Sequence, residues 1–243
     1  MEIGSSYQYD EIRYYPLSSK VRIHLSQEPL LELPLPFEVE VEKIWQEQNE
    51  VKNNLYNTPL LSYVSHDEQR IFGQFVEYRH FVACQYHPEL RKSLNVCPLS
   101  VSGLCLSDDH ILVGKRDMKL STYGGYYECI PSGTIEARAY SHGEVDFFMQ
   151  LAWELEEEAH IGEKMIQEIH PLGLFYDEKM GIYDIGMWVR LDLLKQERRN
   201  EGSEEYPMIE WMPIAKWQQL LAEPDAKIVP LSKALWKVYS SFS

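Results

Sequence analysis

Three glutamates near the middle of the chain have the spacing of a metal-binding helix face. Glu154, Glu157 and Glu158 stand at positions i, i+3 and i+4, and on a helix these side chains project from one side. Three like charges so close together repel one another and weaken a helix unless a cation binds them. A hard divalent cation such as Mg²⁺ prefers carboxylate oxygens, usually together with substrate phosphates. The alternative interpretation is a solvated acidic face.

The segment around these glutamates has the pattern of an amphipathic helix preceded by a turn. We expect the helix over residues 144–160, because apolar side chains recur there with helical period and carboxylates flank them. The apolar stripe consists of Phe148, Leu151, Leu155 and Ala159. Residues 131–136 read Pro-Ser-Gly-Thr-Ile-Glu, a composition typical of a turn.

The other elements are expected to form a mixed sheet between helices. Strand patterns occur at 99–106, 111–115, 126–130, 169–176, 182–191 and 208–213, and helical patterns at 214–221 and 231–239. Strands are thus followed by one acidic helix, more strands and terminal helices. This order predicts an α/β (α+β) layered domain.

The N-terminal third is expected to form a small strand-rich region. Strand patterns occur near 21–25 and 37–41, a helical pattern over 40–53, a hairpin from 60–64 and 71–78, and an interrupted helix over 78–94. We therefore expect a strand and helix region over residues 1–97 and a second domain over residues 98–243.

Composition and charge narrow the class of protein. The 243 residues, 44% of them hydrophobic, suffice for one sizeable core or for a domain with a smaller partner. The net charge of −15 argues against nucleic-acid binding, because phosphate contacts need Lys and Arg. It does not exclude a phosphorylated small molecule, since a bound metal ion inverts the local charge.

The same composition predicts a cytoplasmic protein that does not enter membranes. The four cysteines form no C-x-x-C pair, as expected of buried thiols in a reducing compartment. The sequence has no signal-peptide pattern and no apolar run of about 18 residues.

Residues 99–217 resemble a Nudix hydrolase domain. The box of that family reads G-x5-E-x7-R-E-U-x-E-E-x-G-U, where U is a bulky aliphatic residue, and this chain offers Gly133, then Glu144, then W-E-L-E-E-E-A-H-I over 153–161. The strand Ile-Leu-Val-Gly-Lys-Arg over 111–116 and the late strand Ile-Glu-Trp-Met-Pro over 209–213 also resemble members of the family.

The chain departs from this box in four places. The gap between Gly133 and Glu154 is six residues longer than in the family, and Glu144 lies one residue early relative to the acidic run that follows it. Trp153 takes the place of the box arginine, and His160 takes the place of a glycine. The arginine normally orients the metal-binding glutamates, so its absence implies slower catalysis or another cation in its role. The insertion, the missing arginine and the N-terminal third resemble the branch that contains UDP-sugar pyrophosphatases.

The resemblance implies a Mg²⁺-dependent pyrophosphohydrolase, with Mn²⁺ as an alternative ion. Glu154, Glu157 and Glu158 would bind the metal ion, together with the carbonyl group of Gly133, and one of the glutamates would instead act as general base. The preferred substrate is a UDP-sugar, cleaved to UMP and sugar 1-phosphate. The alternative is a weakly active or inactive Nudix-fold protein that senses a nucleotide-like ligand or binds another protein, and a homodimer is a further expectation.

Five side chains outside the glutamate triad are further candidates. Arg116 would hold a substrate phosphate or form a surface ion pair. Tyr78 would stack on a nucleobase and Arg79 would hold phosphate, with core packing and an ion pair as their alternatives. Glu136 and Asp177 would contribute a ligand or a base, or belong to an exposed loop and a hairpin turn.

Overall fold

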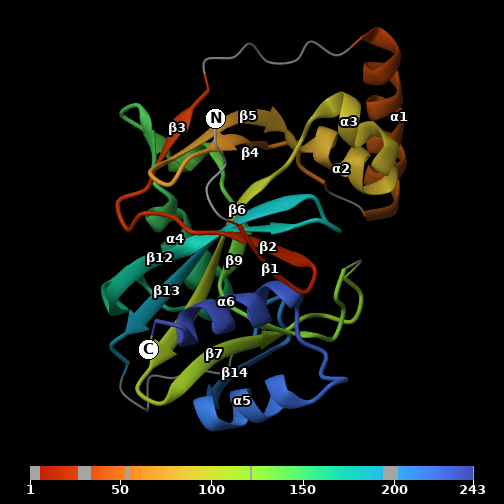
Figure 1. Ribbon diagram of the computed structural model, residues 1–243. Helices are drawn as coiled ribbons and strands as arrows, with labels where there is room; N and C mark the ends of the chain where they lie inside the picture. The colour runs from red at the N-terminus through yellow and green to blue at the C-terminus, as the bar shows by residue number, and fades with distance from the viewer. Residues whose placement is uncertain (1–5, 27–33, 53–54, 121, 194–201, 243) are drawn as a thin grey trace.

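The computed structural model describes residues 6–26, 34–52, 55–120, 122–193 and 202–242. In these residues two β-sheets are stacked end to end with helices packed around them (Figure 1). The expected α+β class, a mixed sheet between helices with a smaller strand-rich N-terminal region, is confirmed. None of the described helices is long and apolar enough to cross a membrane.

The larger sheet carries the candidate site. Nine strands of the described chain form it, and the main path runs β1 (Tyr7–Tyr9), β2 (Ile12–Tyr15), β12 (Ile166–Asp177), β13 (Ile182–Leu191), β6 (Leu99–Ser107), β7 (His110–Lys115) and β14 (Met208–Pro213). Off this path, β8 (Tyr127–Cys129) pairs with β7, and β9 (Ser132–Thr134) pairs with β6. The sheet is mixed, because β13 and β6 run parallel while β12 and β13 run antiparallel.

The smaller sheet joins the N-terminal region to the segment after Gly133. Its order is β10 (Tyr140–Ser141), β11 (Glu144–Val145), β3 (Arg22–Leu25), β5 (Arg70–Glu77) and β4 (Pro59–His66). Val145 of β11 pairs with Ile23 of β3. The residues that lengthen the gap before the acidic helix therefore form a hairpin that extends the N-terminal sheet. The expected boundary at residue 97 stays a prediction.

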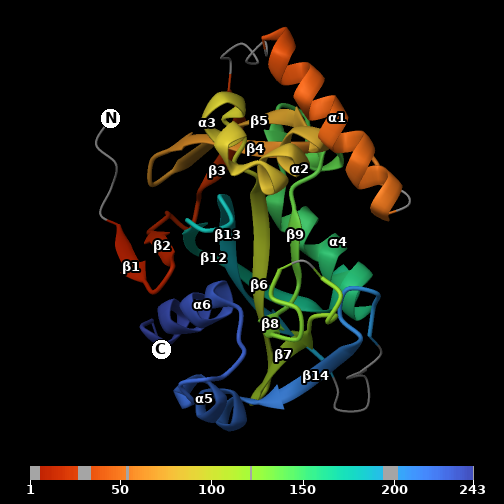
Figure 2. The ribbon, with the colours of Figure 1, turned by 90° about the vertical axis from the view of Figure 1, so that its right-hand side faces the viewer.

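Helices cover both faces of the larger sheet. On one face α4 (Phe147–Ala159) packs against β6 and β9, and on the other face α6 (Pro230–Ser240) packs against β12 and β13 (Figure 2). The helix α5 (Ile214–Ala222) follows β14, while α1 (Leu35–Lys52), α2 (Tyr78–Tyr86) and α3 (Arg91–Leu94) gather at the far end beside the smaller sheet. Short 3₁₀ turns span Pro88–Leu90, Ala137–Ala139 and Glu163–Met165.

The helix α4 forms where the apolar period predicts it. Leu151 and Leu155 are fully buried against the sheet. The carboxylate of Asp146 caps the helix by accepting a hydrogen bond of 2.9 Å from the backbone N–H of Met149. At the other end His160 takes a left-handed conformation with φ of 56°, which glycine adopts most easily.

One expected strand is wrong. Residues 37–41 belong to α1 and not to a strand. Alternation in this segment suggested a strand face, yet Val39 is exposed while Val41 and Ile44 are buried in the core shared with α2. Burial at a spacing of three residues decides for a helix.

Candidate functional site

The acidic helix lies with two of its glutamates against β9. The carboxylate of Glu158 is buried and accepts hydrogen bonds of 3.3 and 3.4 Å from the backbone N–H of Ser132. The carboxylate of Glu154 presses against Gly133, where an added Cβ would overlap it. Gly133 is therefore required so that the carboxylate can approach the backbone. The glycine and the two glutamates, expected together from the sequence, do lie together.

A buried glutamine orients Glu154. The side-chain amide of Gln150 donates a hydrogen bond of 2.7 Å to Glu154 Oε1. The carbonyl oxygen of the same side chain accepts a hydrogen bond of 3.2 Å from the backbone N–H of Glu136. Gln150 thus ties the glutamate to the loop after Gly133. The sequence analysis did not single out Gln150, although its position four residues before Glu154 was a usable signal.

The environment of the two glutamates disfavours their charge. Burial, followed by the charges of Glu157 and Glu136, raises the pKa of Glu154 to about 7, although the hydrogen bond from Gln150 acts in the opposite direction. Burial also raises the pKa of Glu158, and the neighbouring charges of Glu205 and Glu154 add to this rise. A bound cation would offset both effects.

Glu157 lies apart from the other two glutamates. It is exposed, is absent from the cavity wall, and its Oε1 pairs with Arg138 Nη2 at 2.8 Å. The structure therefore brings together Glu154 and Glu158 of the expected triad. Glu157 lies outside this pair, on the exposed side of the helix.

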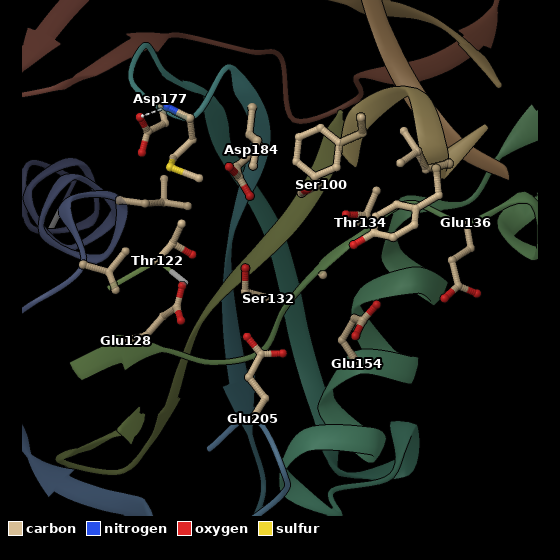
Figure 3. Close-up of a pocket in the computed structure, with 18 of the residues that line it drawn as sticks. Ser100, Thr122, Glu128, Ser132, Thr134, Glu136, Glu154, Asp177, Asp184 and Glu205 are labelled. Carbon is tan, nitrogen blue, oxygen red and sulfur yellow. Dashed lines mark hydrogen bonds between the residues drawn. The ribbon is translucent and has the colours of Figure 1, made fainter. Parts of the chain in front are cut away.

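A cavity of about 490 Å³ opens between Glu154 and the N-terminal region. Its wall contains Glu128, Glu136, Glu154, Asp177, Asp184 and Glu205, and Figure 3 shows how these carboxylates surround a common space. Among the described residues that line it, Arg116 is the one basic side chain. An anionic ligand would be repelled from such a wall unless cations accompanied it.

Arg116 lines this cavity but is already paired. Its guanidinium contacts Glu128, and a second contact of 3.1 Å reaches Glu205. Burial alone would lower the pKa of Arg116, but the charges of these two glutamates raise it overall. The hydroxyl of Tyr206 also donates to Glu128 at 2.8 Å. The arginine thus forms the ion pair weighed from the sequence, although in the interior and not at the surface.

The two N-terminal candidates have different positions. Tyr78 lines the cavity. Arg79 is absent from the wall, and its guanidinium contacts Glu77 at 2.7 Å, Glu42 at 3.1 Å and Glu38 at 3.2 Å. Because Glu38 and Glu42 belong to α1, Arg79 joins α1 to α2. The structure does not bring Arg79 to the candidate site.

Asp184 is a buried carboxyl group that the sequence analysis did not single out. It lies in the cavity wall on β13 and accepts a hydrogen bond of 2.9 Å from the hydroxyl of Ser102, which is 3.0 Å from the hydroxyl of Ser132. Burial raises the pKa of Asp184 to about 7. An aspartate inside an otherwise apolar strand pattern was the available signal.

Asp177 and Glu136 also reach the cavity wall. Asp177 closes the turn after β12, since its Oδ1 accepts hydrogen bonds of 2.9 Å from the backbone N–H groups of Lys179 and Met180. The hairpin-turn interpretation of Asp177 therefore holds alongside its position in the wall.

The donor set suits a hard divalent cation. The carboxylate of Glu154 adjoins Gly133 and that of Glu158 adjoins the backbone of Ser132, so the available side-chain donors are oxygens, as Mg²⁺ and Mn²⁺ prefer. Within the described part of the chain, no three Asp, Glu, His or Cys side chains are already grouped as metal ligands. The chemistry of the residues fits the ion, and ion binding would have to draw the carboxylates together against their mutual repulsion.

No protein-family model matches the chain, and no curated protein matches it. Among solved structures, a Nudix hydrolase from Nitrosomonas europaea is similar with 14% identity and a TM-score of 0.44, over 60% of this chain and 90% of that one. The MutT protein from Methanosarcina mazei Go1 has 16% identity and a TM-score of 0.43, over 60% and 94%. An Ap4A hydrolase from C. elegans has 12% identity and a TM-score of 0.41, over 59% and 96%. Structural similarity at this level does not assign a family or an activity to this chain, and both have to be argued from its own residues.

Proposed function

We propose that this protein is a Mg²⁺- or Mn²⁺-dependent pyrophosphohydrolase of the Nudix type. Its substrate is a nucleoside diphosphate joined to a second group, with a UDP-sugar as the preferred choice and UMP and sugar 1-phosphate as products. The observation that carries the proposal is the packing of half-buried Glu154 against Gly133 and of buried Glu158 against the backbone of Ser132, with Glu154 in the wall of an acidic cavity. Carboxylates with raised pKa values are costly to the fold when ionised and are common at functional sites.

In this mechanism the chain binds the ion and orients the reactants. Glu154 and Glu158 would hold the ion together with the Gly133 carbonyl group, and Gln150 fixes the orientation of Glu154. Such an ion would supply positive charge against the pyrophosphate and would lower the pKa of an attacking water. The remaining carboxylates of the wall repel an anionic substrate that carries no cations. Positioning of the reactants and stabilisation of charge supply most of the rate enhancement. One of Glu154, Glu157 and Glu158 serves as general base.

The far wall of the cavity suits the nucleoside part. Tyr56, Tyr78 and Phe81 line it there, and aromatic rings offer apolar faces to a base. The small-molecule substrate, the cytoplasmic location and a homodimer remain our predictions for this protein.

A ligand sensor is the second candidate. It is favoured by the pairing of Arg116, the basic residue of the described cavity wall, with Glu128 and Glu205. A sensor would bind a nucleotide derivative in the same cavity and release no product.

The test is a substrate panel read by coupled phosphate release. Nucleotide sugars, ADP-ribose, dinucleoside polyphosphates and NADH are incubated with the protein and Mg²⁺, Mn²⁺ or chelator, and added phosphatase liberates phosphate from the monoester products. The proposal predicts metal-dependent turnover of at least one nucleotide sugar. Binding of these compounds without any turnover would support the sensor and contradict the hydrolase.

A further inference from the structure

Arg138 connects the loop after Gly133 to the acidic helix. Its Nε contacts Glu136 Oε2 at 2.8 Å, and its Nη2 donates to Glu157 Oε1 at 2.8 Å. The guanidinium carbon lies 4.6 Å from the ring centroid of Trp153, so the cation stacks on the indole. One planar group is thereby fixed by two carboxylates and one aromatic face.

The stability of the fold does not explain this arrangement. The side chains of Arg138, Glu136 and Glu157 are 44%, 47% and 56% exposed. Ion pairs this exposed contribute little to folding. Their position beside Glu154 suggests another role, since Glu157 lies on the same helix as Glu154, and the backbone N–H of Glu136 donates to Gln150, which itself donates to Glu154.

We infer that Arg138 is a positioning residue that holds Glu157 and Glu136 at the rim of the metal site. Trp153, the residue before Glu154 on α4, stacks on the guanidinium and so fixes its plane beside the helix. Each recorded contact uses one oxygen of a carboxylate that has two. The second oxygen of Glu157 can therefore turn to a cation while the first stays on Arg138.

The inference rests on the proposed metal site. It predicts that cation affinity falls when Arg138 is removed, whereas simple electrostatics predicts that cation affinity rises. Removing a positive charge near an acidic site should tighten cation binding if only charge mattered. If Arg138 positions Glu157, its removal frees two carboxylates to rotate into water, and metal binding weakens. The sign of the change in affinity therefore separates the two roles.

The experiment titrates the full-length protein with Mn²⁺ and follows free Mn²⁺ by electron paramagnetic resonance. It compares wild type with Arg138→Ala, Arg138→Lys and Arg22→Ala. The control variant removes a similar exposed ion pair, Arg22 with Glu144 at 2.8 Å, from the smaller sheet. Melting temperatures without metal verify that each variant folds, and Arg138→Gln replaces Arg138→Ala if the latter does not.

We expect the Mn²⁺ dissociation constant of Arg138→Ala to rise roughly tenfold to a hundredfold, as for other residues that orient metal ligands. Arg138→Lys should recover part of the affinity because it keeps the charge, and Arg22→Ala should bind as wild type does. Unchanged or tighter Mn²⁺ binding in folded Arg138→Ala would overturn the inference alone. A wild-type protein that binds no Mn²⁺ would overturn the proposed function together with it.

Discussion

Replacing Glu154 by glutamine should stabilise the metal-free protein while it removes function. The substitution keeps the shape of the side chain and its ability to accept the hydrogen bond from Gln150, and it deletes the charge. The carboxylate is packed against Gly133 and is only partly exposed. An ionised group in such a place is unfavourable to folding unless a cation compensates it.

The size of the effect follows from the pKa of Glu154, which burial raises from 4.5 to about 7. Because the folded state holds this proton more tightly than the unfolded state, ionised Glu154 lowers stability as pH rises from 4.5 to 7. With about 1.4 kcal/mol per pKa unit, the loss above pH 7 reaches about 3 kcal/mol. Glu154→Gln should regain up to this amount at pH 8 and almost none at pH 4.

Urea unfolding at pH 4 and pH 8 measures this difference, with and without Mg²⁺. The matched control is Glu156→Gln, an exposed glutamate on the same helix. Mg²⁺ should stabilise wild type and the control but not Glu154→Gln, because a ligand that binds only the folded state raises its stability. Turnover of Glu154→Gln should fall at least ~10²-fold.

Two results would refute this reasoning. A Glu154→Gln variant that is less stable than wild type at pH 8 would show that the charge is not a burden on the fold. Equal stabilisation of wild type and Glu154→Gln by Mg²⁺ would show that Glu154 does not bind the ion.

Three further predictions concern other parts of the site. Gly133→Ala should weaken Mn²⁺ binding with little change in melting temperature, because the new methyl group displaces the carboxylate of Glu154 and flexible side chains yield easily; unchanged Mn²⁺ affinity by calorimetry would contradict it. Arg79→Ala should lower the free energy of unfolding by about 1–3 kcal/mol, because three glutamates lose their cationic partner. The same variant should leave KM unchanged. A raised KM with normal stability would instead identify Arg79 as a substrate ligand. Asp184→Asn should increase stability above pH 7 and not at pH 4, because burial raises the pKa of Asp184 to about 7; a pH-independent difference in urea unfolding would argue against a buried charge.

The sequence predicted the parts of the site that depend on local periodicity. Leu151 and Leu155 recur with the helical period, so the acidic helix was placed within a few residues of its observed bounds. Helical geometry also predicted that Glu154 and Glu158 share a face. The larger sheet followed in the same way from alternating and apolar strand patterns.

Other features depend on contacts between distant segments. The pairing of Val145 with Ile23 joins the loop before the acidic helix to the N-terminal sheet, and no local pattern encodes such a register. The loop that carries Arg138 is held near Trp153 partly by this pairing, so the contact between Arg138 and Trp153 could not be predicted from the linear sequence.

Charged residues were the least predictable part. A guanidinium has several possible partners, and the sequence does not tell which of them lies near it. For Arg79 a phosphate contact and an ion pair were both open, and the structure shows ion pairs that join two helices. Arg116 reaches the cavity but is held by Glu128. Conversely, Asp184 lies in the cavity wall, but it was not predicted there because its neighbours in β13 are mostly apolar.

The most direct test of the account is the hydrolysis of UDP-glucose by wild type, Glu158→Gln and Glu156→Gln, with Mg²⁺ or with chelator. Phosphorus NMR identifies UMP and sugar 1-phosphate as they form. We predict metal-dependent product formation by wild type and by the exposed control, and at least ~10² slower formation by Glu158→Gln. Equal rates for Glu158→Gln and wild type, or hydrolysis that persists in chelator, would contradict the assignment of a metal site to Glu154 and Glu158.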